Sequence, residues 1–275
     1  MSERDTIDYS ASSPLTEESI LEDLCALGIE RGDTLIVHSS LSSLGWVSGG
    51  AVAMIQSLQR SVGTRGTLVM PAHSGDLSDP AQWENPPVPE AWWKVIRESM
   101  PAYDRHRTPT RAMGIVPELF RTWPGVLRSG HPELSFSALG KRKHRVVRDP
   151  MRGSGFDNPL GDRSPVGALY ELGGKILLLG VGYDSCTCLH LAEYRANWNG
   201  KKASLHGAPV MRGGKRVWVE FEDIEYDTVD FPAIGRAFEA SLGARIGKVG
   251  KAEAHLLDVR ELVDFAVSWM EEHRR

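Results

Sequence analysis

The hydrophobic positions of this chain change their spacing along the sequence, from a helical period to short continuous runs. Residues 20–27 have helical spacing, and Thr16 precedes them as a candidate N-cap with two glutamates in the first turn. A β-rich run follows at 34–38, then a helical pattern at 52–58 and a second strand at 66–71. Because a strand, a helix and a strand in this order build parallel sheets, the pattern predicts an α/β fold.

The later part of the chain extends this architecture. The further predicted elements are a helix at 111–120, a strand from Lys175, a strand at 216–221, and helices at 231–242 and 260–272. Two passages, 83–93 and 132–162, are irregular, and in the first one prolines oppose regular structure beside Trp92 and Trp93. We therefore expect a central, mostly parallel or mixed sheet flanked by helices in αβα layers, with loop-rich insertions.

The composition is that of an ordinary globular protein. The chain has 275 residues, of which 41% are apolar and 25% are charged, and its net charge is −4. No apolar run approaches the ~20 residues needed to span a bilayer, and the polar start has no signal-like region. We expect one domain over residues 1–275 with a flexible start at 1–14. We also expect a cytoplasmic monomer or homodimer without membrane or nucleic-acid partners.

The charged residues are unevenly distributed. Residues 220–230 contain six acids and no basic residue, whereas residues 141–148 contain five basic residues. An acidic stretch can receive a cationic substrate and a basic stretch can receive phosphates, although solvated surface turns give the same pattern. Neither run identifies the function by itself.

The three cysteines, Cys25, Cys186 and Cys188, give no disulfide framework, which suits a reducing compartment. Cys186-x-Cys188-x-His190 contains zinc-ligand residue types, but the spacing is unlike that of metal sites and no second ligand cluster accompanies it. We expect no metal and interpret both thiols as small residues beside the site. A covalent route through Cys188, which is close in sequence to His190, is the alternative mechanism.

His190 and Glu193 form the clearest candidate site. They stand three residues apart on a helix-compatible segment, so they share one helix face just beyond the carboxyl end of the strand from Lys175. A histidine there can act as a base, with the carboxylate orienting it. The chain has no Gly-x-x-x-x-Gly-Lys-Ser/Thr loop and no Gly-x-Ser-x-Gly elbow, which disfavours P-loop nucleotidases and α/β-hydrolases.

Seven segments, in order along the chain, carry a family resemblance. They are residues 37–50, 66–71, 83–87, 108–114, 128–132, 164–165 and 187–194. Together they closely resemble the aminoglycoside 3-N-acetyltransferase family. The resemblance implies transfer of an acetyl group from acetyl-coenzyme A (acetyl-CoA) to the 3-amino group of the deoxystreptamine ring of an aminoglycoside, which confers antibiotic resistance. It also implies an α/β fold distinct from that of GCN5-type acetyltransferases.

The resemblance implies that His190 is the general base, with Glu193 and Thr187 beside it. An ammonium cannot attack a thioester, so a proton must leave first, and a histidine accepts one near neutrality. Glu193 orients the imidazole, stabilises its imidazolium form or binds a substrate ammonium, and the sequence leaves these three roles open. His38, at the end of a strand that faces the same crevice, is a second candidate for a catalytic or positioning role.

The resemblance also implies binding residues for both substrates. The Ser-rich loop after His38 resembles the family's CoA segment, where small residues let backbone N–H groups approach an anion closely. The implied cofactor contacts are Ser39, Ser40, Trp46, Val47, Arg111, Met113 and Gly114. The implied aminoglycoside contacts are Asp76, Trp92, Glu193 and Asp223. Polycationic sugars need such carboxylates and flat faces. One departure is Cys186, where the family pattern has asparagine.

The sequence therefore predicts an acetyl-CoA-dependent N-acetyltransferase that works by direct transfer in a ternary complex, with His190 as the base. Two alternatives stay open. The same fold and cofactor can serve an amine that is not an aminoglycoside. The alternative from another class is a catalytically silent protein that binds CoA or a polycation, although pure binding does not need a titrating base.

Overall fold

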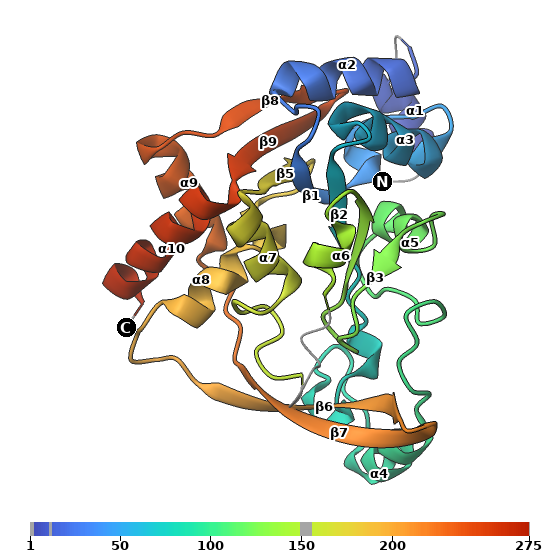
Figure 1. Ribbon diagram of the computed structural model, residues 1–275, viewed down its shortest axis with the longest axis vertical. Helices are drawn as coiled ribbons and strands as arrows, with labels where there is room; N and C mark the ends of the chain where they lie inside the picture. The colour runs from blue at the N-terminus through green and yellow to red at the C-terminus, as the bar shows by residue number, and fades with distance from the viewer. Residues whose placement is uncertain (1–2, 11–12, 149–155, 275) are drawn as a thin grey trace.

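A mixed sheet forms the centre of the molecule (Figure 1). The computed structural model describes residues 3–10, 13–148 and 156–274, and all elements named below belong to these residues. The strands of the sheet are β1 (Thr34–Ser39), β2 (Thr67–Pro71), β3 (Leu127–Arg128), β4 (Phe136–Gly140), β5 (Lys175–Leu179), β8 (Arg245–Val249) and β9 (Ala252–Asp258). Their order is β3-β4-β2-β1-β5-β9-β8. β1 pairs in parallel with β2 and β5, whereas β4 and β9 run antiparallel to their inner neighbours.

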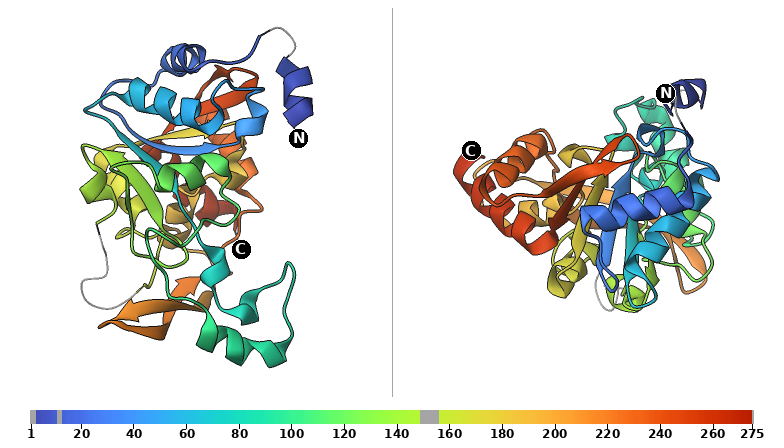
Figure 2. Two further views of the ribbon diagram at one scale, coloured as in Figure 1. Left: turned by 90° about the vertical axis from the view of Figure 1, so that its right-hand side faces the viewer. Right: turned by 90° about the horizontal axis from the view of Figure 1, so that it is seen from above.

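Helices cover both faces of this sheet (Figure 2). One face carries α2 (Glu17–Leu27), α3 (Gly50–Val62) and α5 (Ile115–Arg121). The other carries α6 (Lys143–Val146), α7 (Pro165–Leu172), α8 (Leu189–Arg195), α9 (Phe231–Ser241) and α10 (Val259–His273). The predicted α/β fold with a mixed sheet between helical layers is confirmed.

Alternation along the central strands explains the two layers. In β1, Leu35 and Val37 belong to the core under α2 and α3, whereas Ile36 belongs to the core under α8 and α10. All three side chains are fully buried. Because both faces of the central strands are buried, each strand is a continuous apolar run in the sequence.

The start of α2 is also as predicted. The Thr16 hydroxyl accepts a hydrogen bond from the backbone N–H of Ser19 at 3.2 Å, and the Ser19 hydroxyl accepts one from the backbone N–H of Thr16 at 3.0 Å. These reciprocal bonds form a capping box that satisfies two free donors at the helix N-terminus.

A long antiparallel hairpin stands apart from the main sheet, at the end of the molecule that is lowest in Figure 1. It consists of β6 (Ala203–Arg212) and β7 (Lys215–Ile224), and α4 (Glu90–Ser99) lies beside it. Arg216 Nε donates to the carbonyl of Met100 at 2.6 Å, and the Tyr103 N–H donates to the carbonyl of Pro209 at 2.9 Å. The insertion that contains α4 and the hairpin therefore pack against each other.

The structure corrects the prediction for residues 83–93. Trp92 and Trp93 do not lie in an irregular passage, because they belong to α4. Pro89 directly precedes this helix, and proline is tolerated at a helix start because no intrahelical N–H bond is needed there. The prolines therefore mark the boundary of a helix.

Other predicted boundaries also differ. The helix predicted at 111–120 begins only at Ile115, after Gly114 with its positive φ of 86°. The tract predicted as loop at 132–162 contains β4 and α6, and its residues 149–155 lie outside the described residues. β4 forms through its pairing with β2, which a local pattern does not reveal. A further helix, α1 (Glu3–Ser10), was not predicted.

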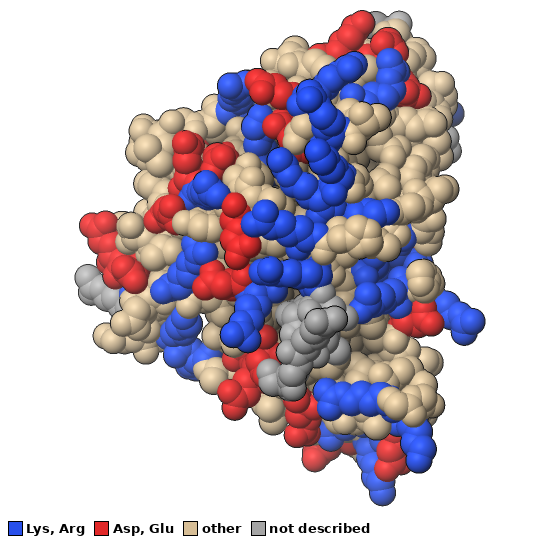
Figure 3. Space-filling view, in the orientation of Figure 1, with Lys and Arg blue, Asp and Glu red and all other residues tan. Residues whose placement is uncertain are grey.

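Lys and Arg side chains gather in the middle of the face shown in Figure 3. The basic run at 141–148 contains α6, and two of its residues contact α7: Arg145, in α6, and Arg148, just after it, lie 3.5 and 3.8 Å from the Glu171 carboxylate. Lys143 Nζ donates to the carbonyl of Gly125 at 2.6 Å. This run therefore contacts α7 and the loop before β3. No helix in the described part of the chain combines the length and apolar character needed to cross a membrane.

The contact between α9 and the turn η4 (Tyr183–Ser185) gives a test of the packing. A Cβ on Gly235 would lie 2.1 Å from the Tyr183 ring. We expect Gly235→Val to lower the free energy of unfolding by about 2 kcal/mol, because overpacking forces the helix and ring apart. Ala240→Val, at an exposed position of the same helix, should change it by less than about 0.5 kcal/mol. Denaturant unfolding measures both, and equal effects would contradict this contact.

Candidate active site

Three histidines stand near the carboxyl ends of three adjacent parallel strands. His38 is the penultimate residue of β1, His73 follows β2 by two residues, and His190 lies in α8, the helix after β5. β2 and β5 lie on opposite sides of β1, so the chain changes direction across the sheet at this point. Such a switch point opens the crevice in which open α/β sheets place their ligands.

Alternation along β1 divides this edge into two sides. His38 shares a face with Ile36, which packs under α8, and Ser39 shares a face with Val37, which packs under α3. The His38 imidazole therefore points toward the helix that carries His190, whereas Ser39 lines a pocket on the other face.

His190 and Glu193 form a direct pair. Both side chains extend from one face of α8, and His190 Nδ1 lies 2.5 Å from Glu193 Oε2. The Glu193 side chain is fully buried, and the His190 side chain is 15% exposed. With Nδ1 donating to the carboxylate, Nε2 is the ring nitrogen left for chemistry.

The other oxygen of Glu193 is also engaged. Oε1 accepts hydrogen bonds from the backbone N–H of Asp227 at 3.0 Å and from Arg274 Nη1 at 2.7 Å. Arg274, just beyond α10, also donates to Asp230 through Nε and Nη2 at 2.7 and 2.6 Å. A carboxylate removed from water needs such partners. This arrangement favours an orienting role for Glu193 over contact with a substrate ammonium.

Aromatic rings enclose the imidazole of His190. Its centroid lies 4.6 Å from that of Tyr226 and 5.1 Å from that of Phe231. The Tyr226 hydroxyl donates to Asp223 Oδ2 at 2.7 Å, and the Tyr194 hydroxyl donates to Oδ1. Asp223 is buried, and this burial raises the pKa of its carboxyl. Asp223 therefore holds Tyr226 in place against His190.

His38 and His73 are uncharged at neutral pH. Desolvation, together with the charge of His190, lowers the pKa of His38 to about 4 and that of His73 to about 3. The Nε2 atoms of both rings and the Ser39 hydroxyl have no hydrogen-bond partner within the described residues. Unpaired buried polar atoms are uncommon in folded proteins, and these three lie at or just beyond the carboxyl ends of β1 and β2.

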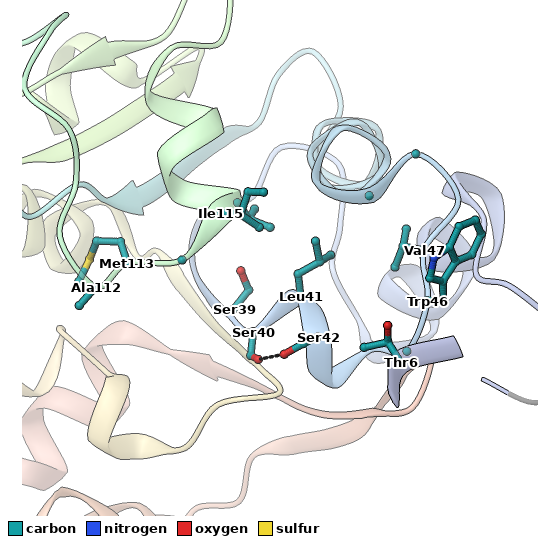
Figure 4. A pocket seen from close by; sticks show the side chains of 15 residues that line it. Thr6, Ser39, Ser40, Leu41, Ser42, Trp46, Val47, Ala112, Met113 and Ile115 are labelled. Atoms are coloured by element: carbon teal, nitrogen blue, oxygen red, sulfur yellow. Dashed lines mark hydrogen bonds between the residues drawn. The ribbon is translucent and has the colours of Figure 1, made fainter. Parts of the chain in front are cut away.

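A pocket of about 850 Å³ lies on the side that Ser39 faces (Figure 4). Its walls come from the loop after β1, the start of α3 and the segment that leads into α5. The predicted cofactor residues that line it are Ser39, Ser40, Trp46, Val47, Met113 and Gly114. Gly49 and Gly50 line it as well, so the N-terminus of α3 lies in the wall. Free backbone N–H groups at such a position suit an anion.

The other predicted binding residues lie in different surroundings. Arg111 Nε is 3.5 Å from Asp76 Oδ1, and both side chains are more than half exposed. Arg111, the predicted contact to a CoA phosphate, and Asp76, a predicted contact to an aminoglycoside ammonium, thus form an ion pair with each other. Trp92 is exposed on α4, and Thr187 is buried in the turn before α8.

Cys186 and Cys188 are fully buried in the core under α8. Burial raises the pKa of the Cys186 thiol to about 12 and that of the Cys188 thiol well above its usual range. A shielded, protonated thiol is a poor nucleophile. Across the described residues, we find no group of three or more His, Cys, Asp or Glu side chains arranged to hold a metal ion.

Arg274, Tyr226 and His73 were not predicted from the sequence. Arg274 is 81 positions from Glu193, and it reaches the carboxylate because α10 packs against α8. No local pattern marks such a residue. Tyr226 lies inside the acidic run, where charge was the visible signal. His73 follows a predicted strand directly, and this position was the available signal.

Known proteins resemble the chain along nearly its whole length. The family described as "Aminoglycoside 3-N-acetyltransferase" matches residues 36–271. The SPbeta prophage-derived aminoglycoside N(3')-acetyltransferase-like protein YokD of Bacillus subtilis (strain 168) is 51% identical, over 94% of this chain and 94% of its own. Aminoglycoside N(3)-acetyltransferase VII of Streptomyces paromomycinus is 36% identical, over 95% of this chain and 93% of its own.

Solved structures share the fold. The crystal structure of YokD from Bacillus subtilis matches with a TM-score of 0.94 and 48% identity, covering 98% of each chain. The binary complex of AAC-IIIb with CoASH matches with a TM-score of 0.83 and 33% identity, over 94% of this chain and 97% of the other. AAC-VIa bound to sisomicin matches with a TM-score of 0.85 and 29% identity, over 94% and 98%. The likeness therefore includes the strand edge described above.

The pair of Arg274 and Glu193 gives a stability prediction. We expect Arg274→Met to lower the free energy of unfolding by about 3 kcal/mol, because a buried carboxylate loses its cation. Adding Glu193→Gln should recover part of that loss, since it removes the stranded charge. The control is Lys94→Met, which breaks the exposed pair with Glu98 and should cost less than about 0.5 kcal/mol. Similar losses of unfolding free energy for Arg274→Met and Lys94→Met would show that Arg274 does not stabilise the buried carboxylate of Glu193.

The lowered pKa of His38 gives a pH prediction. Because its pKa is about 4 in the folded protein and about 6.5 in an unfolded chain, the unfolded state binds more protons between these values. The free energy of unfolding should therefore fall as the pH drops from 6.5 to 4, with about 3 kcal/mol of the loss due to His38. In His38→Asn, the slope against pH should be shallower in this window. An unchanged slope would mean that His38 is not desolvated.

Proposed function

This chain belongs to the aminoglycoside 3-N-acetyltransferase family, and on that premise we propose that it acetylates an aminoglycoside with acetyl-CoA. The reacting group is the 3-amino group of the deoxystreptamine ring. The observation that carries this proposal is the pairing of His190 with the buried Glu193 on the helix that follows β5, near the carboxyl ends of the central parallel strands. AAC-IIIb with CoASH and AAC-VIa with sisomicin support the two partners.

His190 acts as the general base of a direct transfer. The neutral amine attacks the thioester carbon, and His190 Nε2 takes the proton that the nitrogen must lose. The new C–N bond forms, the C–S bond breaks, and the proton passes from His190 to the departing CoA thiolate. The products are an amide and a free thiol, so the proton is returned and the base is regenerated.

Glu193 and Arg274 are positioning residues for that base. The bond from His190 Nδ1 to Glu193 orients the ring and leaves Nε2 to accept the proton. When the imidazolium forms, the adjacent carboxylate stabilises its charge. Arg274 and the Asp227 N–H hold that carboxylate in its place.

CoA occupies the pocket lined by Ser39 and Ser40. The N-terminus of α3 offers free N–H groups and the positive end of its dipole, which suit the pyrophosphate. Ser39 lines this pocket, and its buried hydroxyl has no hydrogen-bond partner within the described residues. Ser39 and His38 face opposite sides of β1, but they are consecutive residues at its end, so the acyl donor and the base meet around the end of this strand.

Direct transfer is favoured over an acyl-cysteine intermediate. Cys188 is fully buried, and the pKa of its thiol is raised well above the usual range. At neutral pH the thiolate needed for attack is therefore scarce, and the sulfur is shielded from both substrates. By contrast, the His190 ring remains partly exposed.

Substitutions separate the two routes. We expect His190→Ala to lower kcat by about 10³-fold, because the amine loses its proton acceptor. Cys186→Ala and Cys188→Ala should keep turnover within about threefold, since neither thiol reacts. Thiol release from acetyl-CoA with gentamicin measures all three. The reverse ranking would establish the covalent route.

A substrate panel tests the function itself. Wild-type protein is assayed with acetyl-CoA and gentamicin, kanamycin, apramycin or simple primary amines, and the acetylated nitrogen is located by NMR. We expect acetylation of the 3-amino group of at least one aminoglycoside. Activity confined to simple amines would reject the aminoglycoside, and tight binding of CoA without acetylation of any amine would establish a binding protein instead.

A further inference from the structure

Helix α1 forms part of the wall of the pocket that we assign to CoA. Thr6, only 8% exposed, lines this pocket together with Trp46 and Val47. In Figure 4, Thr6 lies beside these two residues, at the opposite end of the pocket from Ala112 and Met113. An element that precedes the sheet in sequence therefore contributes a surface to the pocket.

Hydrogen bonds fix the N-terminal segment to the loop at 46–48. The Ser10 hydroxyl donates to the carbonyl of Thr6 at 2.8 Å and accepts from the backbone N–H of Trp46 at 2.6 Å. Farther along, the Leu15 N–H donates to the carbonyl of Trp46 at 2.9 Å, and the Ser48 N–H donates to the carbonyl of Leu15 at 2.8 Å. The same loop is thus held by α1 and by the residues before α2.

Gly45 permits this close approach. Its φ is +99°, a conformation that side chains disfavour, and a Cβ there would lie 2.7 Å from the Ser10 hydroxyl. Gly45 itself lines the pocket. The residue that lets α1 approach the loop therefore belongs to the same wall.

From these contacts, we propose that α1 is a CoA-binding element, with Thr6 in direct contact with the bound cofactor. The inference rests on the placement of CoA under the proposed function. Ligand sites bury most of the surface of their ligand. A wall formed by α1 increases the area of CoA that is buried from solvent on binding. Removing this surface should weaken the binding of CoA without affecting the chemistry at His190.

Two neighbouring positions on α1 provide a matched test. Thr6→Phe places a bulky ring in the pocket, whereas Ile7→Phe places the same ring at a position that is 52% exposed. We expect Thr6→Phe to raise the Kd for CoA by about tenfold or more, and Ile7→Phe to leave it within about twofold. Calorimetry measures the Kd, and thermal unfolding verifies that both variants are folded. With saturating acetyl-CoA, Ile7→Phe should keep the kcat of the wild type.

A second measurement needs no substitution. CoA should slow hydrogen exchange of the backbone amides of α1 in the wild-type protein, because bound ligand restrains this helix. Equal Kd values for the two variants, or unchanged exchange in α1 when CoA is bound, would overturn the inference alone. A wild type that does not bind CoA would overturn the proposed function and this inference together.

Discussion

The buried carboxylate of Glu193 is the constraint on which the site depends. A carboxylate without exposed surface is stable only where cations and N–H groups replace water. His190 on the same helix, the backbone of Asp227 after β7, and Arg274 after α10 supply these groups. Three distant parts of the chain are therefore held around one charge. The orientation of the imidazole follows from this arrangement, since Nδ1 has to face the carboxylate.

The central strands make the rest of the site rigid. Ile36 and Val37 are fully buried on opposite faces of β1. Because side chains alternate along a strand, this packing also fixes the faces on which His38 and Ser39 lie. His38 must therefore face the layer of α8, and Ser39 the layer of α3. A sheet buried on both faces thus separates the polar edge into a side that faces the helix of His190 and a side that faces the pocket lined by Ser39.

Features of the fold and the site could be predicted from the sequence where their signal lies within a few neighbouring residues, and not where they depend on contacts between residues distant along the chain. Buried strands such as β1 and the capped helix α2 were predicted because their signals lie within a few residues, and the His190–Glu193 pair has helical spacing. β4 was missed because it forms through pairing with β2. Arg274 was missed because only tertiary packing brings it to Glu193. Of the predicted ligand contacts, Asp76 and Arg111 lie beside each other on the surface, and their role toward a ligand stays a prediction.

The three imidazoles near this edge of the sheet have surroundings that suit a base to different degrees. An effective base has a pKa near the working pH, and desolvation holds the pKa values of His38 and His73 at about 4 and about 3. A proton on either ring would meet low dielectric surroundings, with no carboxylate bonded to it. His190 alone among the three has such a carboxylate, at 2.5 Å. The surroundings of His38 and His73 therefore disfavour a proton on either ring, which leaves His190 as the candidate base that Glu193 orients.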